Sequence, residues 1–349
     1  MNPFVLAILL SSLGLGTTLT FASSHWLLAW MGLEINTLAI IPLMTQHHHP
    51  RAVEATTKYF LTQATAAAMI LFASTTNAWL TGEWGIQQLS HPVAATTAFM
   101  ALALKVGLAP VHFWLPEVIQ GLDLSTGLLL STWQKLAPFA LIIQVAPFAD
   151  PIILTTLGIS STLVGGWGGL NQTQLRKILA YSSIAHLGWM VLVLQFAPSL
   201  TLLALLTYIL MTASAFLTFN TTCSTSISVL ATTWAKAPAL VGLASLVLLS
   251  LGGLPPLTGF MPKWLILQEL TKQGLPLTAT IAALTALLSL YFYLRLCYAM
   301  SLTISPNTTP ATTPWRLSTN QLYLPLATVT MAALALLPLT PAVSALLNP

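Results

Sequence analysis

Apolar stretches of about twenty residues follow one another along almost the whole chain and carry very few charges. Of the 349 residues, 56% are hydrophobic and only 5% are charged. Soluble domains carry about 25% charged residues, so this chain has too few to cover a surface that faces water. A helix of roughly 20 apolar residues crosses the bilayer core and satisfies its own backbone hydrogen bonds there. The chain is therefore predicted to be an all-α polytopic membrane protein.

The apolar stretches divide into about eleven predicted transmembrane helices, with no soluble domain between them. They cover 3–22, 25–45, 56–80, 92–120, 124–146, 151–170, 175–196, 199–222, 238–271, 276–300 and 322–346. Two of these helices contain Gly and Pro residues that break a helix, near 107–111 and near 252–262. The whole chain, residues 1–349, is thus expected to form a single transmembrane domain.

The two broken helices are the fourth and the ninth of the series. An odd number of steps separates them, so they cross the membrane in opposite directions. Broken helices in corresponding positions of two antiparallel halves are typical of an inverted-topology repeat. We expect a first five-helix repeat over 1–146, a second over 151–300, and an extra C-terminal helix over 322–346.

Basic residues at the ends of the predicted helices indicate an orientation. If the N-terminus lies inside, seven of these residues lie on the inner side and only Lys272 lies on the outer side. The seven are Arg51, Lys58, Arg176, Lys177, Lys236, Arg295 and Arg316. Inner loops of membrane proteins carry an excess of Lys and Arg, so we expect the N-terminus inside and the C-terminus outside.

Three further lysines, Lys105, Lys135 and Lys263, fall within predicted transmembrane helices. A charge near the bilayer centre costs roughly 2.5 to 3.5 kcal/mol, so it usually marks an ion pathway, a proton relay or a charged partner. Lys105 and Lys263 adjoin the two helix breaks, where exposed backbone groups can hold water. The alternative for each lysine is that it snorkels to a lipid headgroup, which works only near the end of a span. Lys135 lies about eleven residues into its span.

A carboxylate, Glu34, lies within the second predicted helix and needs a partner, for which an intramembrane lysine is the natural choice. At an effective dielectric near 20, a carboxylate about 6 Å from an ammonium contributes roughly 3 kcal/mol. Moving that carboxylate would load or release a proton on the lysine. The alternative is a fixed structural ion pair.

His112 and His186 are secondary relay candidates, because imidazole titrates at about pH 6.5. The alternative for each is a helix-packing role. His47, His48 and His49 favour a short polar loop over a metal site. Cys223 and Cys297 form no CxxC pair, so we expect no iron–sulfur or zinc site. The chain also contains no Gly-rich nucleotide loop and no basic run for nucleic acid, so no redox centre, cofactor or nucleic-acid partner is expected on it.

Five stretches of the sequence resemble the NADH dehydrogenase subunit 2 family, the antiporter-like membrane subunits of respiratory complex I, in its vertebrate form. They are Met31–Met44, Ala103–Leu122, Leu128–Leu141, Gly165–Met190 and Gly252–Leu270. Together they run along nearly the whole chain. The resemblance implies an antiporter-like fold of two inverted five-helix bundles with an extra C-terminal helix. Single pieces, such as a Pro-broken helix with a lysine, are shared with cation/proton antiporters generally.

The resemblance also implies roles for the buried charges. Glu34 would be the modulating glutamate, and Lys105 the lysine beside the first broken helix. Lys135 would be the bridging lysine and Lys263 the exit-side residue at the second break, where some members of the family carry Glu. His112 and His186 would line the central hydrophilic axis.

The implied function is proton translocation in the membrane arm of complex I, a proton-translocating NADH:ubiquinone reductase. FMN, iron–sulfur clusters and ubiquinone would bind to other subunits of the complex. The implied partners are neighbouring antiporter-like and small membrane subunits, and phospholipids including cardiolipin. The implied location is the mitochondrial inner membrane, with the N-terminus on the matrix side and the C-terminus on the intermembrane-space side.

Two other functions fit the same residues. A stand-alone cation/proton antiporter would share the broken helices and the buried lysines, but would need no partner. An assembly scaffold would keep the buried charges as relics without a transport role.

Overall fold

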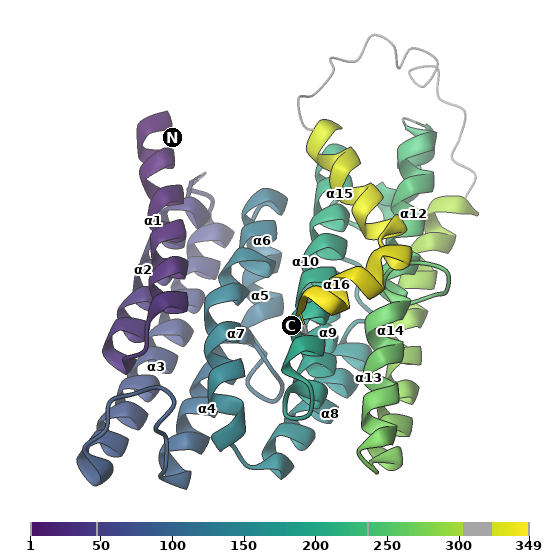
Figure 1. Cartoon of the computed structure of the whole chain (residues 1–349). Helices are drawn as coiled ribbons and strands as arrows, with labels where there is room; N and C mark the ends of the chain where they lie inside the picture. Colours follow the sequence, from purple (N-terminus) through teal and green to yellow (C-terminus); the bar gives the residue numbers. More distant parts are fainter. Residues whose placement is uncertain (1, 47, 236, 303–322, 348–349) are drawn as a thin grey trace. The chain divides into compact units, whose positions relative to one another are not determined.

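A computed structural model describes residues 2–46, 48–235, 237–302 and 323–347 of the chain (Figure 1). Within these residues the regular structure is helical, and no strand longer than an isolated bridge occurs. Three residues used in the predictions from the sequence lie outside the described residues: His47, Lys236 and Arg316. The same holds for most of the connection before the predicted C-terminal helix. The contacts divide the chain into two compact units, Met1–Gly158 and Ile159–Pro349.

The first unit contains seven α-helices and the start of an eighth among its described residues. They are α1 (Pro3–Ala22), α2 (Trp26–Met44), α3 (Pro50–Thr81), α4 (Pro92–Val106), α5 (Trp114–Gly121), α6 (Leu124–Ser131), α7 (Trp133–Val145) and the first part of α8 (Pro151–Gly168). Proline opens α1, α3, α4 and α8, where its fixed φ suits the first turn and its missing N–H costs nothing.

Helices α1 and α2 pack against each other through two glycines. A Cβ atom placed on Gly16 would lie 2.5 Å from Oδ1 of Asn36, and one on Gly32 would lie 2.6 Å from Cγ2 of Thr20. Lipid tails are as apolar as a leucine side chain, so helices in a membrane associate through close packing. Small residues such as glycine allow this close approach. This packing holds α2, the helix that carries Glu34, against the N-terminal helix.

The second unit contains the remaining helices. They are the rest of α8, α9 (Leu175–Leu194), α10 (Pro198–Thr221), the short α11 (Ile227–Thr232), α12 (Pro238–Gly252), α13 (Phe260–Lys272), α14 (Pro276–Ser301), α15 (Tyr323–Ala335) and α16 (Thr340–Leu347). Its described residues bring α10 against α9, α12 and α15, and α14 against α12 and α13.

Six helical segments among the described residues are long and apolar enough to cross a membrane. They are Pro3–Ala22, Trp26–Met44, Leu124–Phe148, Leu175–Leu194, Pro198–Thr221 and Pro276–Ser301. The pair of α15 and α16 would be a seventh if it forms one span. The chain is therefore an all-helical protein with several membrane-spanning segments.

Two predicted helices differ from the structure. The helix expected over 124–146 is interrupted at Thr132, which separates α6 from α7. The helix expected over 322–346 is replaced in the described residues by α15 and α16, which are bent by 65° at their junction. Pro338 lies in the short turn between the two helices. Because proline lacks an N–H and its ring clashes with the preceding turn, it bends or ends a helix there.

Candidate functional site

A buried lysine and a carboxylate face each other within the first unit. Nζ of Lys105, near the end of α4, lies 3.9 Å from Oε1 of Glu34 in the middle of α2. Lys105 is buried, and the Glu34 side chain is 23% exposed. The second carboxylate oxygen of Glu34 accepts a hydrogen bond of 3.2 Å from the hydroxyl of Thr37, one turn along the same helix. The two charges form an ion pair but are too far apart for a direct hydrogen bond.

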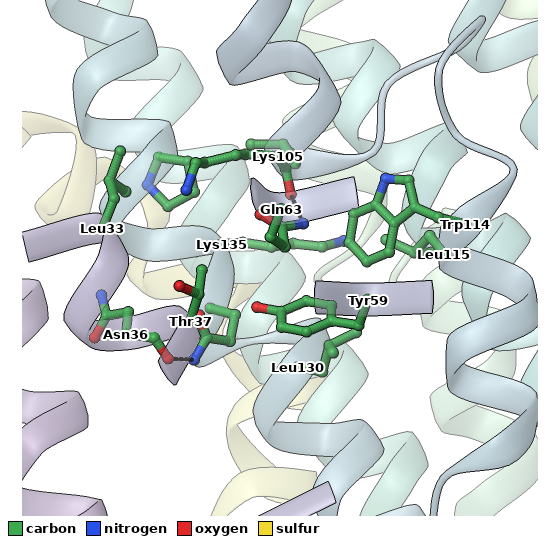
Figure 2. A pocket seen from close by; sticks show the side chains of 13 residues that line it. Leu33, Asn36, Thr37, Tyr59, Gln63, Lys105, Trp114, Leu115, Leu130 and Lys135 are labelled. Carbon is green, nitrogen blue, oxygen red and sulfur yellow. Dashed lines mark hydrogen bonds between the residues drawn. The ribbon is translucent and has the colours of Figure 1, made fainter. Parts of the chain in front are cut away.

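Lys105 and Lys135 line the same small cavity inside this unit (Figure 2). Its volume of about 20 Å³ is enough for at least one water molecule. Its lining is mixed. The polar residues around it are Asn36, Thr37, Tyr59, Gln63, Lys105, Gln134 and Lys135, and the others are Leu33, Val106, Trp114, Leu115, Leu130 and Pro138.

Both lysines are held inside the unit rather than at its surface. Lys105 is 6% exposed and Lys135 is 3% exposed. Lys135 lies in the first turn of α7, directly after the interruption at Thr132. The neighbouring Gln134 donates a hydrogen bond of 3.2 Å from Nε2 to the backbone carbonyl of Asn36 on α2. This bond joins the start of α7 to the helix that carries Glu34.

The position of Lys105 is set by the way α4 ends. Gly107 has a φ of +88°, in the left-handed region that favours glycine, and its N–H donates to the carbonyl of Ala103. The last carbonyls of a helix have no partner within it. Here Nε1 of Trp114, on α5, donates to Leu104 O at 3.0 Å, and Nε2 of Gln63, on α3, donates to Lys105 O at 3.4 Å.

Trp114 and Gln63 therefore fix the end of the helix that carries Lys105, and both also line the cavity. Neither residue is among the site residues predicted from the sequence. A glutamine in an apolar helix was the available signal for Gln63, because a buried amide needs a partner.

Lys263 is placed at the other helix break, in the second unit. It lies in the first turn of α13, and its Nζ donates a hydrogen bond of 2.7 Å to the carbonyl of Gly252, the last residue of α12. Gly253, which follows, has a φ of +81°. An ammonium group thus caps the C-terminal end of a broken helix, where the helix dipole favours positive charge.

The two histidines are placed in different units. His112 lies in the connection between α4 and α5, where it is buried and its ring centre lies 4.4 Å from that of Phe113. His186 lies in α9, with its ring centre 5.7 Å from that of Tyr208 on α10. Neither residue lines the cavity of Lys105 and Lys135. Their proposed relay role stays a prediction.

The two helix breaks have the same local sequence pattern. Residues 107–117 read GLAPVHFWLPE, and residues 253–263 read GLPPLTGFMPK. Aligned without a gap, the segments share Gly, Leu and two prolines, and each ends on a charged residue, Glu117 or Lys263. In both, the glycine adopts a left-handed conformation and closes the preceding helix. Both breaks were predicted from the sequence, but their alignment was not.

Possible metal ligands do not cluster in the part of the chain that the structure describes. No group of three or more His, Cys, Asp or Glu side chains there could hold a metal ion. The chemistry that the described site offers is therefore that of buried ammonium groups, one carboxylate and neutral polar side chains around a cavity.

Two family models match the chain and together cover most of it. One, described as NADH:quinone oxidoreductase/Mrp antiporter, TM, matches residues 23–289. The other, described as the NADH dehydrogenase subunit 2 C-terminus, matches residues 290–344.

Curated relatives match over the full length. The NADH-ubiquinone oxidoreductase chain 2 of Oncorhynchus mykiss is 77% identical over 347 residues, which is 99% of both chains. That of Danio rerio is 70% identical over 98% of this chain and 99% of its own.

Solved structures share the fold. A chain of respiratory complex I from Thermus thermophilus with bound aureothin is 31% identical, with a TM-score of 0.84 over 99% of this chain and 80% of that chain. A chain of the Mrp complex of a Dietzia species has a TM-score of 0.83 over 97% of this chain and 76% of that chain. At 18% identity, this second likeness concerns the fold alone.

Proposed function

Because this chain belongs to the NADH-ubiquinone oxidoreductase chain 2 family, we propose that its buried lysines carry protons through the membrane arm of respiratory complex I. The chain is a membrane subunit of this NADH:ubiquinone reductase. The main support for this relay is that Lys105 and Lys135 line the same cavity, with Oε1 of Glu34 3.9 Å from the ammonium of Lys105. Lys263 continues the relay in the second unit.

The electrostatics of the Glu34–Lys105 pair suit a proton-loading step. At 3.9 Å and an effective dielectric near 20, the attraction is about 4 kcal/mol, and the cost of burying both charges offsets part of it. Moving one charge against 100 mV costs about 2.3 kcal/mol. A change in the distance between Glu34 and Lys105 therefore changes the free energy of protonating Lys105. The size of this change is comparable to the cost of one translocation step.

A proton released by Lys105 can pass to Lys135 across their cavity. Water in the cavity, together with the neutral polar groups of Tyr59 and Gln63, would offer the hydrogen bonds for this transfer. Lys263 acts as the exit-side group, since its ammonium caps the second helix break. His112 and His186 are secondary members of the relay, close to the first break and within α9.

We infer an architecture of eleven spans in two inverted five-helix repeats, over 1–146 and 151–300, with a C-terminal helix after them. The common pattern of the breaks supports it. So do two isolated bridges: His25–Gly85 joins the start of α2 to the connection after α3, and Gln174–Ser226 joins the start of α9 to the connection after α10. By this correspondence α2 matches α9, and α3 matches α10.

The inferred location is the mitochondrial inner membrane, with the N-terminus on the matrix side and the C-terminus on the intermembrane-space side. The excess of basic residues on the side of the N-terminus supports this orientation. A cysteine introduced at Arg316 should be protected from an impermeant thiol reagent added from the outer side. Rapid labelling from that side would contradict the orientation.

The inferred partners are the neighbouring antiporter-like and small subunits of the membrane arm, and phospholipids including cardiolipin. FMN, iron–sulfur clusters and ubiquinone belong to other subunits in this proposal. Proton movement on this chain is then driven by electron transfer at a distance. This dependence on partners separates the proposal from a stand-alone antiporter, which would exchange cations for protons as the purified chain in liposomes.

The relay is tested by Lys105→Ala and Lys135→Ala in the intact complex. Each variant should lower the number of protons translocated per NADH oxidised, while NADH oxidation with an uncoupler persists. Full proton translocation by both variants would contradict the relay.

A further inference from the structure

An ion cluster on the first unit joins the broken helix to α3. Nζ of Lys58, on α3, lies 2.8 Å from Oε1 of Glu54 and 2.7 Å from Oε2 of Glu117 on α5. All three side chains are partly exposed. The hydrogen bond from Lys58 holds the pKa of Glu54 below its usual range, so Glu54 remains ionised at neutral pH. One ammonium therefore serves two carboxylates, of which Glu117 alone belongs to the broken helix.

Glu117 occupies the position in the first break that Lys263 occupies in the second. The gap-free alignment of 107–117 with 253–263 pairs Pro116 with Pro262 and Glu117 with Lys263. Both residues lie in the first turn of the helix that follows the break. The charge is reversed, but each position carries a group that can take up and release a proton.

Glu117 is also close to the cavity along its own helix. Trp114 lies three residues earlier on α5, which places the two side chains on the same face of the helix. Trp114 and the next residue, Leu115, both line the cavity of Lys105 and Lys135. One helical turn therefore separates the exposed carboxylate from the wall of the buried site.

The charged groups around Glu117 come from α3, the helix against which α5 packs. They are Lys58 and Glu54, with Arg51 one turn before Glu54. At the other end of α5, a Cβ atom on Gly121 would lie 2.7 Å from the carbonyl oxygen of Arg51 and from Cβ of Ala55. This close approach keeps α5 against the start of α3, which is the end nearest the inner side in the proposed orientation.

We propose that Glu117 is the inlet of the first unit, where protons from the inner aqueous side enter the path to Lys105. A carboxylate oxygen of Glu117 takes a proton from a hydronium ion of the inner aqueous phase: the O–H bond of hydronium breaks and leaves water, a new O–H bond forms on Glu117, and Lys58 is left paired with Glu54. The proton then leaves toward the cavity and Glu117 returns to its charged state. This inlet rests on the proposed function, and the inverted repeat makes it the counterpart of Lys263 at the outlet.

The competing explanation is that the ion cluster is purely structural and only holds α5 against α3. Exposed ion pairs often contribute little to stability, and many have no role beyond such a contact. Glu117→Gln separates the two in the intact complex. The amide oxygen still accepts a hydrogen bond from Lys58, but the side chain no longer takes up a proton. We expect a loss of protons translocated per NADH oxidised as large as that of Lys105→Ala, and recovery in Glu117→Asp. Glu83→Gln, an exposed carboxylate elsewhere in the first unit, is the matched control and should pump fully.

Full pumping by Glu117→Gln would overturn the inlet and indicate a structural contact alone. An equal loss in Glu117→Gln and Glu117→Asp would also overturn the inlet, because a carboxylate that can take up a proton would then not restore pumping. Proton translocation by Lys105→Ala, measured in the same preparations, shows whether the inlet alone is wrong or the relay is wrong as well. If Lys105→Ala loses pumping while Glu117→Gln does not, the relay stands and the inlet lies elsewhere. If neither loses pumping, both are wrong.

Discussion

Nζ of Lys105 and Oε1 of Glu34 lie 3.9 Å apart in the interior of the first unit, and neither atom has a hydrogen-bond partner among the described residues. A buried ion pair built for stability requires close geometry and hydrogen bonds that satisfy the remaining donors and acceptors. The facing atoms of this pair are too far apart for a hydrogen bond, and Thr37 satisfies only the other carboxylate oxygen of Glu34, so the contribution of the pair to stability is small. Two charges held near each other but not locked together suit a step in which the distance between them changes.

Gln63→Leu should weaken the relay without removing a charge. The substitution keeps a similar volume but removes the donor to the carbonyl of Lys105, so the end of α4 becomes less well fixed. We expect a partial loss of proton translocation per NADH and a stability cost of about 1 kcal/mol. Gln87→Leu, at an exposed position after α3, is the control. Unchanged pumping in Gln63→Leu would show that this hydrogen bond does not position Lys105.

Gly16→Ala should destabilise the contact between α1 and α2. The added methyl group would meet Oδ1 of Asn36 at 2.5 Å and the carbonyl oxygen of Gly32 at 2.9 Å. Overpacking of this kind costs typically about 1–3 kcal/mol. The thermal stability of the purified complex and the amount of assembled subunit should both fall. Gly14→Ala on the same helix meets nothing within 4 Å and should behave like the unsubstituted chain. Equal stability of the two variants would refute the close packing.

Gly253→Ala should disturb the second break and Lys263 together. Its φ of +81° costs an alanine about 1–2 kcal/mol, and the new Cβ would lie 2.9 Å from Cδ of Lys263. We expect lower stability and lower proton translocation, because the ammonium can no longer reach the carbonyl of Gly252 in the same geometry. Gly242→Ala, inside α12 with open space around it, is the matched control. A Gly253→Ala variant with normal pumping would argue against the exit role of Lys263.

The sequence predicted those features that depend on composition and on single unusual residues. Apolar length predicted a membrane protein made of helices, and Gly and Pro marked the region of both breaks. Lys105, Lys135 and Glu34 stood out because charges are rare in such helices, and the structure brings these three together around one site. Whether they transfer protons stays a prediction.

The features that the sequence analysis missed depend on tertiary contacts or on comparison of one half with the other. Gln63 and Trp114 are uncharged, and only the structure reveals that they bind the carbonyls at the end of α4. The interruption at Thr132 carries no glycine or proline of its own. Glu117 was not among the site residues predicted from the sequence. The sequence contains its alignment with Lys263, but this alignment is found only when residues 107–117 are compared directly with residues 253–263.

The double replacement Glu34→Leu with Lys105→Met, in the intact complex, tests the central claim most directly. It removes both charges of the pair together and leaves apolar side chains of similar size, so neither member of the pair is left buried without the other. The relay predicts that the complex assembles and oxidises NADH with an uncoupler, but translocates fewer protons per NADH than the unsubstituted complex. An unchanged proton-to-NADH ratio would mean that the buried pair is structural, and would contradict the account.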